Sequence, residues 1–101
     1  LETALPLTLT LVTEGTLELS EAIALLTVKP ARILGIEAGT LSVGAPADIT
    51  LIQPDAVWVV EPEKLQSKSK NTPFAGWEMK GKVYATLVKG KIVYREGIFL
   101  V

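Results

Sequence analysis

The chain has 101 residues, of which 49% are hydrophobic, and its ten Lys and Arg nearly balance eleven Asp and Glu to give a formal net charge of −1. A chain of this length buries only a modest core, and a charge so near zero gives no field that favours nucleic acid or an anionic membrane. Because the sequence contains neither cysteine nor histidine, it excludes disulfides, thiolate or imidazole metal sites and histidine-assisted nucleophiles within this chain.

The distribution of apolar residues indicates where the protein resides. Its apolar runs are far shorter than the roughly 20 residues that cross a bilayer, and no basic leader precedes them. We therefore expect a soluble, cytoplasmic protein that binds neither nucleic acid nor membrane. Since the chain opens at Leu1 inside an apolar segment, and is apolar for its size, we expect a piece of a larger protein that has lost partner surfaces.

The first third of the chain predicts helices. The leucines at 5, 7, 9 and 11 alternate as in a strand, but a helical face also fits, with Thr3 as N-cap, Pro6 in the first turn and Gly15 at the end. We favour the helix. A second helix is indicated by apolar residues at helical spacing after Ser20, the predicted N-cap. Pro30 ends it and begins a short turn at residues 30–34, which stops at Gly35.

After Gly39 the apolar period changes from about 3.6 to 2, which predicts a sheet. Strands are expected at residues 47–52, 57–60, 83–88 and 91–94. The last two form a hairpin across Lys89-Gly90, a two-residue turn that needs a positive φ at Gly90. Between the second and third of these strands we expect a helical turn at 62–65 and a long surface connection at 67–76.

Few residues offer chemistry. The nearest carboxylate pairs are Glu61 with Glu63 and Glu18 with Glu21, and both lie at turn or helix-start signals where a solvated role is favoured over general acid–base work. Residues 76–82 have the G-x-x-x-x-G-K spacing of a phosphate loop, but a valine and a strand pattern follow instead of Ser or Thr and a helix. We interpret Gly81 as a bulge or a close backbone approach.

Two other groups of side chains are interpreted as structural. A small basic cluster in the loop is predicted to be solvated, because no arginine or interleaved aromatic accompanies it. Large aromatic residues near the sheet are predicted to be core or interface anchors. The two groups are Lys64, Lys68 and Lys70, and Trp58, Phe74, Trp77 and Tyr84.

Three separated stretches carry a family resemblance. They read L-E-T-A-L-P-L at 1–7, K-P-A-R-I-L-G at 29–35 continuing to G-T-L-S-V-G-A-P-A-D at 39–48, and S-K-S-K-N-T-P-F-A-G at 67–76. Together they resemble the carboxy-terminal portion of a dihydroorotase of the multi-domain bacterial type, in the amidohydrolase superfamily. The second stretch is similar to a pattern shared with hydantoinases, allantoinases and deacetylases, whereas the third favours dihydroorotase. Lys29 stands where that family more often has Asn.

The resemblance implies an α/β fold. Residues 1–36 would be the closing helices of a (β/α)₈ amidohydrolase barrel, and residues 37–101 the carboxy-terminal part of a small flanking β-sandwich. The implied activity is the zinc-dependent interconversion of N-carbamoyl-L-aspartate and L-dihydroorotate in de novo pyrimidine biosynthesis. Its zinc ligands, carboxylated lysine and catalytic aspartate would lie upstream, so no catalytic or metal role passes to this chain, which alone should be structural and inactive. The upstream loop that meets substrate would end just before Leu1, so no substrate-binding residue is expected here, and Glu2 and Thr3 are the only residues expected near the barrel mouth.

The resemblance also implies how the piece is used. Leu5, Ile23 and Leu26 would pack against barrel strands, and Asp48 would make a structural backbone contact instead of binding metal. An unpaired sheet edge and an exposed apolar face should make the isolated piece aggregate or require its partner. That partner is the remainder of the same enzyme chain, in a homo-oligomer when intact.

Three alternatives remain open at this point. The parent protein could be a non-catalytic, dihydroorotase-like scaffold that binds aspartate transcarbamoylase, or another cyclic amidohydrolase such as an allantoinase or hydantoinase. A third interpretation is an independent β-rich binding module.

Overall fold

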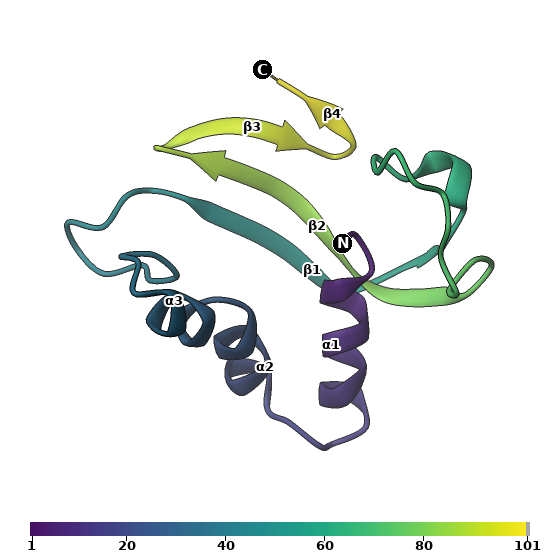
Figure 1. The fold of residues 1–101 in the computed structure, drawn as a ribbon, viewed down its shortest axis with the longest axis horizontal. Coiled ribbons are helices and arrows are strands. Elements are labelled where there is room, and N and C mark those ends of the chain that lie inside the picture. The colour runs from purple at the N-terminus through teal and green to yellow at the C-terminus, as the bar shows by residue number, and fades with distance from the viewer. Residues whose placement is uncertain (101) are drawn as a thin grey trace.

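A computed structural model describes residues 1–100, in which helices precede a small antiparallel sheet (Figure 1). The strands lie in the sheet in chain order, β1-β2-β3-β4. The predicted α/β composition is therefore confirmed. Within residues 1–100, no helix has the length and apolar character needed to cross a membrane. The elements are α1 (Ala4–Thr13), α2 (Leu19–Leu26), α3 (Val28–Leu34), β1 (Ile49–Val59), the 3₁₀ turn η1 (Pro62–Lys64), β2 (Glu78–Val88), β3 (Lys91–Arg95) and β4 (Ile98–Phe99).

Helix α1 confirms the helical interpretation of the first segment. Pro6 lies in its first turn, where a missing N–H leaves no bond unmade. Thr3 occupies the N-cap position, but its side chain makes no capping hydrogen bond. The helix ends as predicted at Gly15, whose N–H donates to Val12 O at 3.0 Å, while the next amide donates to Leu11 O at 2.9 Å.

The starts of α2 and α3 differ from the prediction. Ser20 is not the N-cap of α2, because the helix begins at Leu19 and Glu18 caps it. The Glu18 N–H donates to Glu21 Oε1 at 3.3 Å. This capping box between Glu18 and Glu21 makes the helix begin before Ser20. Helix α3 begins at Val28 instead of at Pro30, which lies inside its first turn. Its end at Gly35, with φ +69°, is as predicted.

The sheet is more continuous than the sequence predicts. One strand, β1, replaces the two expected at 47–52 and 57–60, with its ladder to β2 interrupted between Gln53 and Val57. Pro54 lies in that interruption. Because proline has no N–H to donate to the ladder, the sequence pattern there indicated the end of a strand. Strand β2 begins at Glu78 instead of Val83, and β4 was not predicted.

The predicted hairpin between β2 and β3 is confirmed. Val88 pairs with Lys91, and the two turn residues Lys89 and Gly90 have φ of +50° and +78°. A second turn of this kind, Glu96-Gly97, joins β3 to β4 and has φ of +49° and +85°. Both turns match the right-handed twist of their strands.

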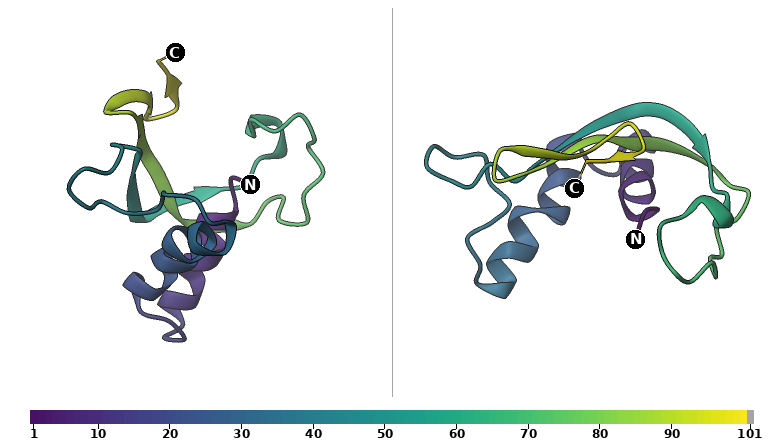
Figure 2. Two further views of the ribbon diagram at one scale, coloured as in Figure 1. Left: turned by 60° about the vertical axis from the view of Figure 1, so that its left-hand side comes forward. Right: turned by 90° about the horizontal axis from the view of Figure 1, so that it is seen from above.

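The helices lie on one side of the sheet (Figure 2, right). Helix α1 packs on β2, and α2 lies between α1 and α3. Leu9 of α1 and Met79 of β2 are 5% and 4% exposed, so the core sits at this contact. The two elements approach closely at Gly81, where a Cβ would lie 2.5 Å from Leu9 Cδ1. The interpretation of Gly81 as a close backbone approach is confirmed.

Much apolar surface remains exposed, as the sequence predicts. Ile33 and Val43 are 85% and 106% exposed. On the sheet, Val57 and Val59 alternate with Trp58, which pairs with the buried Met79, so these valines point to the face away from α1. Strand β1 also leaves one edge unpaired among the described residues. Such surfaces are typical of a chain that packs against further protein.

The residues expected to pack against barrel strands are only partly covered. Leu5 and Ile23 are half-buried and Leu26 is exposed. Their contact with further strands therefore stays a prediction.

Asp48 makes the backbone contact that the sequence predicts. Its Oδ1 accepts a hydrogen bond from Lys89 N at 2.8 Å, and the neighbouring Ala47 O accepts one from Gly90 N at 2.9 Å. The segment before β1 is thus joined to the β2–β3 turn. A signature acidic residue here has a structural function.

Replacement of Asp48 by alanine is expected to lower stability by about 1 kcal/mol, because the Lys89 amide loses its acceptor. The Asp48→Asn variant keeps an acceptor oxygen and should lose less. Hydrogen exchange at the Lys89 amide measures the difference. Equal exchange in the two variants would show that the carboxylate does not hold the turn.

Candidate functional site

A long loop between β1 and β2, residues 61–75, returns to its own starting point. Val60 N donates to Trp77 O at 2.9 Å, and Gly76 N donates to Val60 O at 2.8 Å. Val60 is 1% exposed, so these bonds close the loop at a buried base. We call this segment the 61–75 loop; it has the form of a compact Ω-loop and contains all of the third signature stretch except Gly76 (Figure 1).

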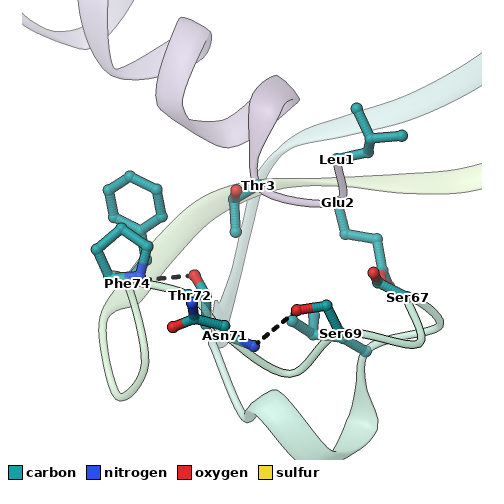
Figure 3. A pocket seen from close by; sticks show the side chains of 10 residues that line it. Leu1, Glu2, Thr3, Ser67, Ser69, Asn71, Thr72 and Phe74 are labelled. Carbon is teal, nitrogen blue, oxygen red and sulfur yellow. Dashed lines mark hydrogen bonds between the residues drawn. The ribbon is translucent and has the colours of Figure 1, made fainter.

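The 61–75 loop and the first three residues enclose a pocket of 230 Å³ (Figure 3). The loop contributes hydroxyl and amide side chains, whereas apolar side chains come from both segments. The volume is below the range of about 300–1,000 Å³ typical of small-molecule sites. The lining residues are Leu1, Glu2, Thr3, Leu65, Ser67, Ser69, Asn71, Thr72, Pro73 and Phe74.

Glu2 and Thr3, the two residues predicted to lie near the barrel mouth, both line this pocket. Glu2 Oε2 accepts a hydrogen bond from Gln66 N at 2.8 Å, and this bond ties the start of the chain to the loop. The structure thus brings both residues together with the third signature stretch. Their closeness to a barrel mouth stays a prediction.

Two lysines of the basic cluster serve the loop itself. Lys64 Nζ lies 2.7 Å from Glu61 Oε2, and the hydrogen bond and charge of that carboxylate raise the pKa of Lys64. Lys70 Nζ donates to Leu65 O at 2.5 Å and to Ser67 O at 2.9 Å. The cluster was predicted to be solvated, but these two lysines bind acceptors of the loop itself.

The other motifs considered for chemistry have structural partners. Glu61 pairs with Lys64, and Glu18 with Glu21 forms the cap of α2. Residues 76–82 lead into β2 instead of a helix, so their amides are not arranged to bind phosphate. Trp58 Nε1 donates to Gly81 O at 2.7 Å, and Phe74 meets Trp77 edge to face at 5.1 Å.

The side chains present do not fit the zinc ion that the family resemblance implies for the longer protein. Zinc in proteins takes histidine, cysteine and carboxylate ligands, and the sequence has neither of the first two. Within residues 1–100, no three acidic side chains are grouped closely enough to hold a metal. No step of a reaction is therefore assigned to a metal at this site.

Sequence reasoning missed two contributors to the site, Gln66 and Lys70. Gln66 acts through its backbone N–H, which leaves no trace in residue type. Lys70 belongs to the basic cluster that was predicted to be solvated. The sequence signal for its binding of loop carbonyls was a lysine that lies among small polar residues.

Comparison with known proteins identifies the relatives of this chain. The model of the Amidohydrolase family matches residues 1–93. The dihydroorotase of Geobacter sp. (strain M21) is 55% identical over 97 residues, which cover 96% of this chain and 23% of the relative. The dihydroorotase of Aquifex aeolicus (strain VF5) is 46% identical over 96 residues, with 95% and 23% covered. The chain thus spans under a quarter of these relatives.

Solved structures show the same fold. A D-hydantoinase superimposes with a TM-score of 0.86 at 28% identity, covering 95% of this chain and 21% of the other. The L-hydantoinase of Arthrobacter aurescens gives a TM-score of 0.85 at 33% identity, covering 95% and 22%.

Proposed function

The chain belongs to the amidohydrolase family, and on that premise we propose that it is the carboxy-terminal segment of a dihydroorotase. The complete enzyme would interconvert N-carbamoyl-L-aspartate and L-dihydroorotate in pyrimidine biosynthesis. The observation that carries this proposal is the contrast in identity: 55% to a dihydroorotase against 28% and 33% to two hydantoinases. Since all three cover nearly the whole chain, the contrast does not come from one short motif.

Within that enzyme the segment has a supporting function. Residues 1–36 close the barrel, residues 37–101 belong to the flanking β-sandwich, and zinc and the catalytic groups lie upstream. The exposed side chains of Ile33, Val43 and Val57 support this assignment, because isolated domains rarely expose so many large apolar groups. The partner is the remainder of the same chain, in a cytoplasmic homo-oligomer.

A hybrid enzyme tests the proposal. The matching residues of the Geobacter sp. (strain M21) dihydroorotase are replaced by this chain, and dihydroorotate hydrolysis is measured in the hybrid and its parent. We expect the hybrid to keep kcat/KM within about tenfold of the parent, which corresponds to about 1.4 kcal/mol of transition-state stabilisation. The 101-residue chain alone should show no activity above buffer.

A matched control replaces the same residues by the corresponding segment of the Arthrobacter aurescens L-hydantoinase. This control should lose more activity, because we expect its apolar faces to fit the dihydroorotase host less well. A folded hybrid, verified by circular dichroism, that is no better than the hydantoinase control would refute the assignment to dihydroorotase.

A hydantoinase is the second candidate, favoured by the TM-score of 0.86 to a D-hydantoinase. If the chain comes from a hydantoinase, it should function better in a hydantoinase host than in the dihydroorotase host. Placed in the L-hydantoinase, this chain would then support hydantoin hydrolysis better than it supports dihydroorotate hydrolysis in the dihydroorotase.

A further inference from the structure

Two side chains of opposite charge hold three consecutive residues of the 61–75 loop. Lys70 Nζ donates to the carbonyl oxygens of Leu65 and Ser67, at 2.5 and 2.9 Å. Between those carbonyls, the Gln66 N–H donates to Glu2 Oε2 at 2.8 Å. The cation thus binds two acceptors and the anion binds the donor between them.

These bonds are independent of the bonds that close the loop. The base is fixed at Val60 by its pairing with Gly76 and Trp77, whereas Glu2 precedes α1 at the other end of the chain. Hydrogen bonds that involve an ionised group are stronger than neutral ones. Glu2 and Lys70 therefore act on the outer part of the loop, while its base stays closed without them.

We propose that Glu2 and Lys70 form a charged clamp that fixes residues 65–67 against the start of α1 and keeps the pocket formed. Lys70 shapes the loop segment, and Glu2 attaches that segment to the residues just before α1. Leu65 and Ser67 line the pocket beside Glu2, as Figure 3 shows for Ser67. Release of the clamp moves this wall away and opens the pocket, a change that loops undergo in nanoseconds to microseconds.

Hydrogen exchange in the hybrid enzyme, followed by mass spectrometry, tests the clamp through the Gln66 amide. Glu2→Ala should speed its exchange about tenfold, because a charge-assisted bond is lost. Glu2→Gln keeps a neutral acceptor and should give an intermediate rate. Lys70→Met should also speed exchange, since the segment loses its shape. The matched control is Lys68→Met, which removes a neighbouring lysine and should leave the Gln66 rate unchanged.

The Gly76 amide, bonded to Val60 at the loop base, gives an internal reference. Its exchange should be unaltered in every variant, which separates release of the clamp from unfolding. If Gln66 exchanges equally in the parent hybrid and in both Glu2 variants, or if Lys68→Met acts as strongly as Lys70→Met, there is no clamp.

The readout does not depend on catalysis. An inactive hybrid that shows the expected exchange would reject the proposed function and keep the clamp, whereas an active hybrid with unchanged exchange would do the reverse. Should a Glu2 variant unfold the hybrid, trypsin cleavage after Lys68 in Lys70→Arg gives a second reading. Arginine keeps the charge, so cleavage there should be slower than in Lys70→Met, and equal rates would overturn the proposal.

Discussion

A single methyl group at residue 39 is expected to destabilise the helical part by about 3 kcal/mol, from backbone strain and overpacking together. Gly39 has φ +76°, and a Cβ there would lie 2.7 Å from both the carbonyl carbon and oxygen of Thr27. The nitrogen of Val28 would be 2.9 Å away. These are backbone atoms of the junction between α2 and α3, so no side-chain rotation can relieve the clash. Gly39→Ala must move the helix pair or the loop.

Gly44 provides the matched control, since it belongs to the same signature stretch. Its φ is +88°, yet a Cβ there would meet nothing within 4 Å. Gly44→Ala should therefore cost only the conformational term, about 1–2 kcal/mol. Urea unfolding midpoints of the hybrid carrying each replacement measure the difference. Equal midpoints would mean that the contact with Thr27 is not tight, and that both glycines are required by φ alone.

The second large effect is expected at the contact between Leu9 and Gly81. Leu9→Ala removes a buried side chain and should cost about 2–5 kcal/mol. Gly81→Ala should also destabilise, because its Cβ would lie 2.5 Å from Leu9 Cδ1 at a φ of +114°. In the double variant the shortened side chain leaves room for the new methyl group. The combined loss should be smaller than the sum of the single losses by at least about 1 kcal/mol.

This double-mutant cycle is measured by the same urea midpoints. Gly76→Ala is the control glycine, because its φ is +80° but it has open space around it. When Gly76→Ala is combined with Leu9→Ala, the loss of stability should equal the sum of the two single losses. If the losses of Leu9→Ala and Gly81→Ala also simply added, the methyl group at residue 81 would not clash with Leu9.

Much of the fold is predictable because local rules and tertiary packing agree. Gly15 and Gly35 end helices in the positions that the sequence indicates, and Lys89-Gly90 forms the expected turn. The interpretation of Gly81 from its place in a strand pattern also holds. In each case the signal is a residue whose backbone preference leaves few alternatives.

The errors arise where two local signals compete. Ser20 is a good N-cap by residue type, but Glu18 paired with Glu21 places the cap two residues earlier. Pro54 marks a break in the ladder, and a sequence cannot distinguish a break within a strand from the end of one. Among residues 1–100 the short strand β4 pairs with β3 alone, and two residues are too few to show a period.

The candidate site is less predictable than the fold. Glu2 and Thr3 were indicated by family resemblance alone, and their neighbours in the pocket come from residues 65–74. The contact between Glu2 and Gln66 joins a carboxylate to a backbone amide 64 positions away. No pattern of residue types records such a pairing, because any residue except proline carries that donor.

The closure of the 61–75 loop at Val60 has a consequence for the length of the loop. With both ends joined at a buried point, insertions or deletions between them leave the register of β1 and β2 undisturbed. Doubling the length of a flexible loop costs only about 0.6 kcal/mol of closure entropy. The length of this segment can therefore change at little cost in folding free energy, while the strands that carry it keep their pairing.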